Sequence, residues 1–396
     1  MTVSATAPVP PSSSLWAAFL PLLPLMLVVF AGFLVVGMAL PVVPLHVSHA
    51  LGQGTVTVGA VMGSQYAASI IGRLVAGSMA DARGPRRATL TGWFALCGVG
   101  LMYLASLAVI DRPALSLALL VVGRLLTGLT EAFVITATLA WGVLRVGPAH
   151  AGKVFGWMGV ALFGAYGAGA PVGAWVHAHF GFAGLAWATV LVPLLVAAAT
   201  LAVHAEAPTH AKRLPFYKVL GAVKLPGLGL TCSSAGFAMI NAFVALLFVQ
   251  RGWGGAALAF TSLGSGFVLA RLVAGHLPDK LGGARVAMAC VLIESVGQLL
   301  LWTAPTALLA CAGAALTGIG YSLAFQSFGV EAVKRAPPQS RGAAMGGYVV
   351  FQDLSMGLAA PLGGWLALHA GISAVYLAGA AAALCAAAIA ATLARG

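Results

Sequence analysis

Six ionisable side chains interrupt the long apolar stretches of this sequence and are the first candidates for chemistry. Three are basic and three are acidic: Arg73, Arg124, Glu131, Arg271, Glu294 and Asp353. A charge in an apolar environment is costly unless it is paired or solvated, so each needs a partner or a task. A carboxyl that is neutral in one state and charged in another can carry a proton. These residues therefore indicate proton transfer within an apolar medium.

Arg124 and Glu131 lie seven positions apart, so on a helix they share one face about two turns apart. Gly128, between them, would let a solute or a neighbouring helix come close. We expect this pair to have a function, and the alternative is a polar pair that only fixes helix packing. Glu131 is our candidate for the carboxyl that takes up and releases the proton, and Asp353 is its rival.

The segment from Arg73 to Arg87 returns 198 positions later, from Arg271 to Arg285, in a chain of 396 residues. Eight of the fifteen positions are identical, including Gly84 with Gly282. A second repeat, shifted by 190 positions, relates Gly167-x-x-x-Pro171-x-Gly173 to Gly357-x-x-x-Pro361-x-Gly363. Internal repeats of this kind indicate that the chain consists of two related halves.

The composition indicates that a lipid bilayer surrounds most of the chain. It is 61% hydrophobic and only 7% charged, with a mean hydropathy of +1.02. Segments near the roughly 20 residues that span a bilayer are typical of transmembrane helices. Twelve such segments, six in each half, are expected at about 15–45, 54–79, 88–109, 113–143, 152–178, 182–204, 223–249, 254–277, 284–303, 306–333, 341–367 and 371–393. The expected fold is therefore an all-α membrane protein of two pseudo-symmetric six-helix bundles.

Four regions follow from this pattern: a disordered tail at 1–14, a first bundle at 15–205, a cytoplasmic linker at 206–222 and a second bundle at 223–396. Fifteen Lys and Arg residues fall in the loops or helix ends on one side, and only Arg112 and Arg251 on the other. Cytoplasmic loops carry the excess of basic residues, so both termini are expected in the cytoplasm. The net charge of +12 is thereby explained as a topology signal, and no nucleic-acid partner is expected.

Motifs of enzymes and cofactor sites do not emerge from the sequence. The segment from Gly147 to Lys153 fits the start of a phosphate-binding loop, but Val154 stands where Ser or Thr is required. The nine histidines are scattered singly, and the five cysteines lie far apart in apolar runs. We therefore expect no metal, no organic cofactor and no disulfide framework, and we expect that the protein is not an enzyme.

Two motifs resemble those of a known family. The run Gly77-x-x-x-Asp81-x-Arg83-Gly84-x-Arg86-Arg87 resembles the loop signature of the major facilitator superfamily, and Arg124-x-x-x-Gly128 resembles its fourth-helix motif. Within that superfamily the chain is similar to a group assigned to arabinose and drug efflux. The resemblance implies that the fourth helix lines a central cavity and that the second and eleventh helices touch across the halves. An ion pair between Arg73 and Asp353 is then within reach. Glu294 and Arg271 have similar depths and could pair within the second half.

The same resemblance implies a latch between the halves on the cytoplasmic side. Asp81 would face the start of the eleventh helix, at 340–343, and Asp279 would face the start of the fifth helix, at 150–153. These contacts would exist only while the cytoplasmic side is closed. The expected latch residues are Gly77, Asp81, Arg86, Arg87 and Asp279.

From these features we expect a monomeric transporter of the bacterial inner membrane that exports a small organic solute by alternating access, in exchange for protons. The proton gradient would be its energy source. The alternatives are proton-coupled uptake, a membrane sensor that does not transport, and a membrane-embedded enzyme. Candidates for the substrate cavity are Phe237, Asn241, Tyr321 and Gln326.

Overall fold

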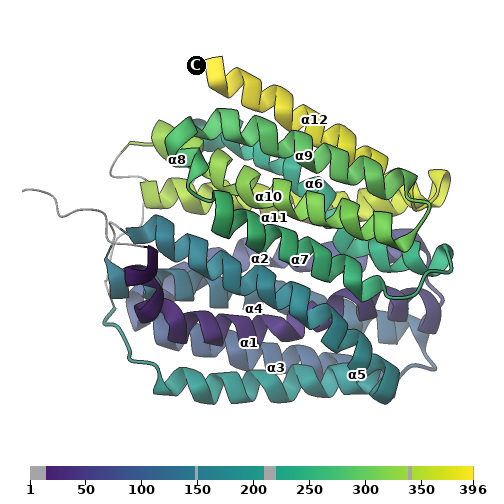
Figure 1. Cartoon of the computed structure of the whole chain (residues 1–396). Coiled ribbons are helices and arrows are strands. Elements are labelled where there is room, and N and C mark those ends of the chain that lie inside the picture. The colour runs from purple at the N-terminus through teal and green to yellow at the C-terminus, as the bar shows by residue number, and fades with distance from the viewer. Residues whose placement is uncertain (1–14, 148–149, 209–219, 338–340, 396) are drawn as a thin grey trace, which may run out of the picture.

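The computed structural model of the chain describes residues 15–147, 150–208, 220–337 and 341–395, all of it helices and short connections (Figure 1). The predicted tail and most of the predicted linker lie outside these residues. The first half contains α1 (Leu15–Leu45), its π-helical extension η1 (His46–Ala50), α2 (Thr55–Arg83), α3 (Pro85–Ala108), α4 (Pro113–Val146) and α5 (Ala151–Ala202). The second half contains α6 (Leu220–Gln250), α7 (Ala256–Ala274), α8 (Leu277–Leu281), α9 (Gly283–Thr303), α10 (Ala307–Arg335), α11 (Arg341–Ala370) and α12 (Ala374–Arg395).

The helices confirm the twelve predicted segments. Helix α5 covers two of them, 152–178 and 182–204. The chain bends between the two at Gly181, which adopts φ 62° and ψ −164°. Among the described residues, nine helices are long and apolar enough to cross a membrane. Two long helices fall outside that set, α2 and α11, and they carry Arg73 and Asp353. Helices are the expected form because lipid offers the backbone no hydrogen-bond partner.

The helices of each half pack mainly on one another, and the two halves meet along a shared interface (Figure 1). In the figure, α1 to α5 form the lower layer, in purple to teal, and α6 to α12 the upper one, in green to yellow. Two helix pairs cross the interface extensively, α2 with α11 and α5 with α7. We call the helix ends next to the linker the linker end, and the opposite ends the far end.

The internal repeat extends to the backbone. Gly84 and Gly282, which are equivalent in the repeat, both adopt a positive φ, of 88° and 90°, and each precedes the next helix. This region of conformational space favours glycine, which explains the residue type at both positions. The two copies differ in the continuity of the helix. Helix α2 runs unbroken to Arg83, whereas α7 ends at Ala274 and the short helix α8 follows. Pro278 accounts for the break, because proline cannot donate to the carbonyl four residues earlier.

Backbone contacts seal the two halves against each other in the far half of the interface. A Cβ at Gly59 of α2 would lie 2.2 Å from the carbonyl oxygen of Ala360 in α11. Thr55 donates a hydrogen bond of 2.8 Å to the carbonyl of Gly364. At the other crossing, Thr261 of α7 donates to the carbonyl of Gly167 at 2.8 Å. Small residues allow such close approach between membrane helices.

The second repeat motif supplies part of this packing. A Cβ at Gly173 of α5 would lie 2.2 Å from the carbonyl oxygen of Met38 in α1. Its counterpart Gly363 of α11 packs as closely on Met239 of α6, where a Cβ would lie 2.4 Å from the sulfur. Both copies of the motif therefore bring their helix into close contact with the first helix of the same half.

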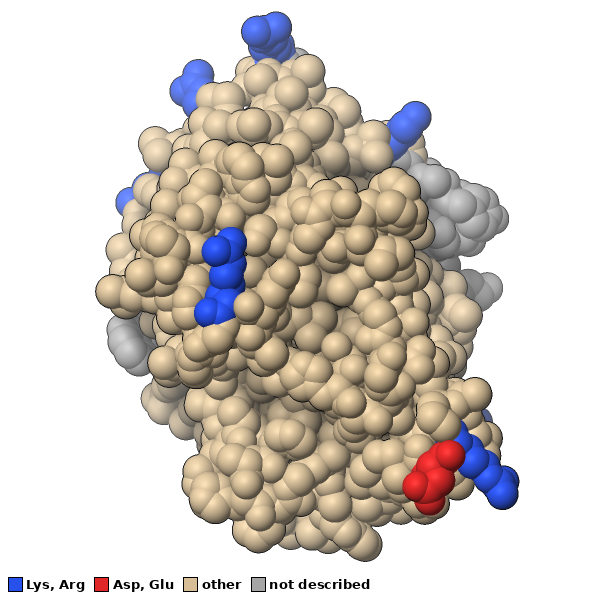
Figure 2. Space-filling model, turned by 90° about the vertical axis from the view of Figure 1, so that its right-hand side faces the viewer, with Lys and Arg blue, Asp and Glu red and all other residues tan. Residues whose placement is uncertain are grey.

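Basic side chains gather at the linker end. Arg83, Arg145 and Lys334 lie in the last turns of α2, α4 and α10. Figure 2 looks at the far end, where the surface is mostly uncharged and a few basic side chains and an acidic one stand apart from one another. The far-end loops contain Arg112 and Arg251, as the sequence pattern predicts.

The far-end contact predicts that Gly59→Leu separates the halves there, because no side chain fits against the Ala360 carbonyl. Overpacking of this kind costs about 1–3 kcal/mol. The melting temperature of the purified protein should fall, and hydrogen exchange at the far ends of α2 and α11 should rise. Gly98→Leu is the matched control, since a Cβ there meets nothing within 4 Å. Equal melting temperatures for the two variants would contradict the seal.

Candidate functional site

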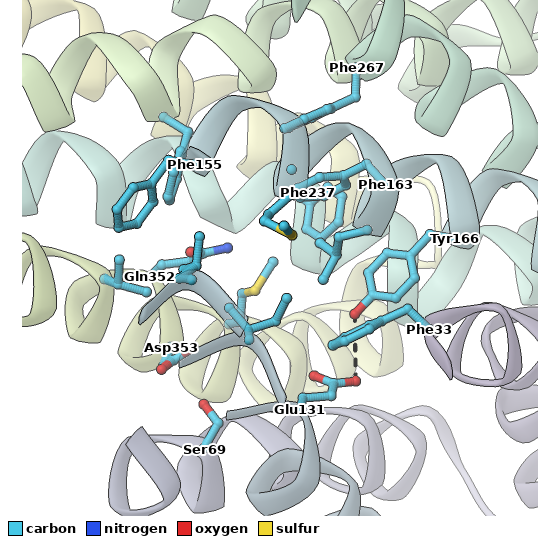
Figure 3. Close-up of a pocket in the computed structure, with 18 of the residues that line it drawn as sticks. Phe33, Ser69, Glu131, Phe155, Phe163, Tyr166, Phe237, Phe267, Gln352 and Asp353 are labelled. Carbon is cyan, nitrogen blue, oxygen red and sulfur yellow. Dashed lines mark hydrogen bonds between the residues drawn. The ribbon is translucent and has the colours of Figure 1, made fainter. Parts of the chain in front are cut away.

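A cavity of about 140 Å³ lies between the two halves, on the linker side of the far-end seal (Figure 3). Its lining reaches from the middle of the helices, at Phe33 and Tyr66, toward the linker end, at Leu139 and Phe155. Both halves contribute, and eight of the lining residues are aromatic: Phe33, Tyr66, Phe155, Phe163, Tyr166, Phe237, Phe267 and Phe325. The charged lining residues are Arg73, Glu131, Arg271 and Asp353.

Arg73 and Asp353 form an ion pair across the two halves, as predicted. The Arg73 Nε donates to Asp353 Oδ2 at 2.5 Å, and Nη2 donates to Oδ1 at 3.0 Å. This bidentate geometry is the strong form of a guanidinium–carboxylate contact. The Asp353 side chain is only 3% exposed, whereas the Arg73 side chain is 22% exposed and borders the cavity. The pair therefore joins α2 to α11 where the interface meets the cavity.

Glu131 projects from α4 into the cavity, beside Tyr166 of α5 (Figure 3). The Tyr166 hydroxyl donates a long hydrogen bond of 3.5 Å to Glu131 Oε1. The charged groups that act on the carboxyl are Arg124, Asp353 and Arg73. Glu131 thus lies in the electrostatic field of the ion pair that joins the halves, and it is partly exposed to the cavity.

Arg124 lies deeper, in the interior of the first half. It is 1% exposed, and its titratable neighbours are Tyr103, Glu131 and Tyr66. Among these neighbours, Tyr103 interacts most strongly with the guanidinium, through its hydroxyl. Gly128, one turn along, faces α2, since a Cβ there would lie 1.7 Å from the carbonyl oxygen of Gln65. The glycine therefore serves helix packing and does not open a path to a solute.

The predicted pairing of Glu294 with Arg271 is wrong. Glu294 is fully buried inside the second half, where the Ser233 hydroxyl donates to its Oε2 at 2.6 Å. Arg271 borders the cavity and donates a short hydrogen bond to Oε1 of Gln326. The two residues have similar depths, but α9 turns its carboxyl toward α6 while α7 turns its guanidinium toward the other half. Depth along the membrane normal could not reveal this difference.

Only one of the four predicted cavity residues, Phe237, lines the cavity. Tyr321 lies behind it, with stacked rings whose centroids are 4.8 Å apart. Asn241 is buried and lies near Tyr66. Gln326 accepts a hydrogen bond from Arg271, which lines the cavity. These three residues therefore support the wall from outside the cavity.

Several lining residues were not predicted. Tyr166 and Tyr66 reach the cavity from α5 and α2. Gln352 lines it as well, and its Nε2 donates a hydrogen bond of 2.7 Å to the Tyr321 hydroxyl. Gln352 lies next to Asp353, which was a signal that could have identified it. For the two tyrosines no signal was available, because many aromatic residues occur in apolar helices and the facing side of each helix decides which ones reach the cavity.

The expected latch lies partly outside the described residues. The structure describes neither 338–340 nor the side chains of 341–343, where Asp81 is expected to bind. The contact of Asp279 with the start of α5 likewise stays a prediction. Arg86 donates to the carbonyl of Leu201 at 3.4 Å, within its own half.

Comparison with known proteins identifies the class. A family model described as the Major Facilitator Superfamily matches residues 25–255 and 226–395. An uncharacterized MFS-type transporter of Salmonella typhimurium is 40% identical over 360 residues, which cover 91% of this chain and 93% of the relative. A second, from Pseudomonas aeruginosa, is 40% identical over 365 residues, covering 88% and 87%.

Solved structures agree on the fold. A mutant form of the nucleoside transporter NupG superposes with a TM-score of 0.76 at 13% identity, covering 94% of this chain and 99% of the other. The human organic anion transporter MFSD10 gives a TM-score of 0.71 at 13% identity, covering 93% and 98%. The chain belongs to the major facilitator superfamily. It is a multi-pass membrane transporter of a small molecule and not an enzyme.

The ion pair between the halves generates a test by double-mutant cycle. Arg73→Met or Asp353→Asn alone leaves a buried charge without its partner and should each lower the free energy of unfolding by about 3 kcal/mol. The double variant should lose less than the sum of the two. Unfolding in a titration with sodium dodecyl sulfate measures all four proteins. Strict additivity would show that the two side chains do not interact.

Proposed function

We propose that this transporter exports a small organic solute, driven by the proton gradient, with Glu131 as the carboxyl that takes up and releases the proton. One observation carries the proposal: Glu131 borders the cavity and shares the electrostatic field of the Arg73–Asp353 pair. A carboxyl in that position reaches water through the cavity and acts on the interface between the halves.

The coupling follows from competition for one positive charge. A charged Glu131 competes with Asp353 for Arg73, because both anions act on that guanidinium. When Glu131 carries a proton, its charge is gone and Arg73 binds Asp353 more strongly. The proton therefore changes the strength of a contact that joins α2 to α11. Rocking of one half against the other would then depend on protonation.

The arrangement of the cavity supports alternating access about the interface. The far end is sealed by backbone contacts, and the cavity lies on the linker side of that seal. With the linker end in the cytoplasm, as the basic residues there favour, the cavity would face inward across the bacterial inner membrane. A solute would enter from the cytoplasm, and opening of the α2–α11 and α5–α7 contacts would release it outside.

Glu131→Gln tests the coupling. Glutamine is isosteric and mimics the protonated carboxyl, so the fold should persist while transport driven by a pH gradient is lost. Exchange of solute at equal pH should remain. A thermal-shift screen of sugars, amphipathic drugs and organic acids supplies the solute, since a ligand stabilises the state it binds. Flux in proteoliposomes is then measured with and without the gradient.

Asp353→Asn is the comparison variant for this experiment. It removes the rival carboxyl from the same field. If Glu131→Gln still concentrates the solute against a gradient and Asp353→Asn does not, Asp353 is the coupling residue. If neither protein concentrates the solute, exchange at equal pH decides: retained exchange means that coupling was lost, and absent exchange means that transport as a whole was lost.

The latch gives a separate test. Asp81→Asn should weaken the closed state of the linker end, because the anion expected to hold α11 there is removed. A cysteine introduced at Gly152, where a Cβ meets nothing within 4 Å, should then react faster with a water-soluble maleimide. Asp111→Asn, which removes an exposed carboxyl at the far end, should leave that rate unchanged. An unchanged rate in Asp81→Asn at normal expression would reject the latch.

A further inference from the structure

Arg271 is the repeat-related counterpart of Arg73, but it lacks the carboxylate that Arg73 has. The shift of 198 positions relates the two arginines, and both border the cavity. The shift of 190 positions, which relates α5 to α11, pairs Asp353 with Phe163. Where α11 offers a carboxylate to Arg73, α5 therefore offers an aromatic ring to Arg271.

The guanidinium of Arg271 lies at the boundary between the halves. A Cβ at Gly159 of α5, one turn before Phe163, would lie 3.7 Å from Arg271 Nη2. The glycine thus leaves room between the guanidinium and α5. The Arg271 side chain is partly buried, its titratable neighbour is Tyr348, and no ion pair to it occurs within the described residues.

Gln326 holds the guanidinium in place. Its Oε1 accepts from Arg271, and its Nε2 donates to the carbonyl of Gly275 at 2.8 Å. That carbonyl lies at the break before α8, which Pro278 creates. A neutral amide therefore orients the cation without neutralising it, and the Arg271 Nε has no hydrogen-bond partner in the described structure.

Among the charged residues that line the cavity, Arg271 is the one without an opposite charge among its described neighbours. Asp353 binds Arg73, and Glu131 lies in the field of Arg124 and Arg73. A buried or half-buried cation is stabilised by an anion, and arginine recognises carboxylate and phosphate groups through paired hydrogen bonds. An anion delivered by the solute would complete the contact between α7 and α5 in the way that Asp353 completes the contact between α2 and α11.

The wall next to Arg271 fits an apolar or aromatic body. Phe163 and Phe267 are stacked, with ring centroids 3.6 Å apart, and both line the cavity. Phe155 and Phe325 also line the cavity. We propose that the solute is an amphipathic organic anion, whose acidic group binds Arg271 between α7 and α5 and whose apolar body packs on these phenylalanine rings. This inference rests on the proposed transport function and specifies its solute class.

Matched compounds that differ only in charge test the assignment. We would measure thermal stabilisation by indole-3-acetate, indole-3-acetamide and tryptamine, and by 3-phenylpropionate, its amide and 3-phenylpropylamine. The anion of each set should bind more tightly than its amide and amine. Inorganic phosphate should stabilise less than the organic anions. Equal or stronger binding of the amides, the amines or phosphate by the wild type would overturn the proposal, whatever any variant does.

Two substitutions locate the binding group. Arg271→Gln should weaken anion binding by about tenfold to hundredfold, the range expected for hydrogen bonds to a charged group. Phe163→Asp should weaken it as well, because it supplies the carboxylate that α5 lacks, whereas Phe163→Asn should weaken it less. Arg251→Gln, at the far end, is the control that should bind like the wild type. Anion binding that is unchanged in both Arg271→Gln and Phe163→Asp would overturn the site.

These measurements need no pH gradient, so they separate the two proposals. If anions bind through Arg271 but Glu131→Gln still couples transport to protons, the proposed coupling fails and the anion site stands. If coupling depends on Glu131 but amines bind better than anions, the anion site fails and the coupling stands.

Discussion

The ion pair between Arg73 and Asp353 is the contact on which the rest of this architecture depends. Lipid solvates neither charge, so α2 and α11 can carry them only if the two helices meet at that depth. The pair thereby ties the register of one half to that of the other. It also borders the cavity, where Glu131 acts on the same arginine. A structural requirement of the membrane and a means of sensing protonation therefore coincide at one place.

The interface around this pair is built for movement as much as for closure. Glycines at 59, 167, 264 and 364 let backbones touch in its far half. A contact between backbones fixes few side-chain rotamers when it forms, so it costs little side-chain entropy. It can therefore open and form again without repacking of side chains. The cavity lies directly on the other side of the seal. Rocking about the interface would therefore exchange one closed end for the other while the helices of each half stay packed.

The two halves are related, and their differences lie around the cavity. Arg124 and Glu131 have no charged counterpart in α10, and Asp353 has a phenylalanine as its counterpart in α5. The repeat keeps the glycines that shape the backbone, among them Gly84 and Gly282, and varies the residues that face the solute. One arginine of the repeat is consequently neutralised by the protein, and its copy is not.

The sequence by itself determined the helices, the repeat, and the depth of each charge. In a bilayer each segment must satisfy its own backbone hydrogen bonds, so length and hydropathy define it locally. The Arg73–Asp353 pair could be predicted because depth and a known helix contact were sufficient. The tertiary structure alone decided that Glu294 meets Ser233, that Arg271 meets Gln326, and that Tyr166 reaches Glu131. Such partners depend on the rotation of each helix about its axis, which packing against several neighbours sets at once.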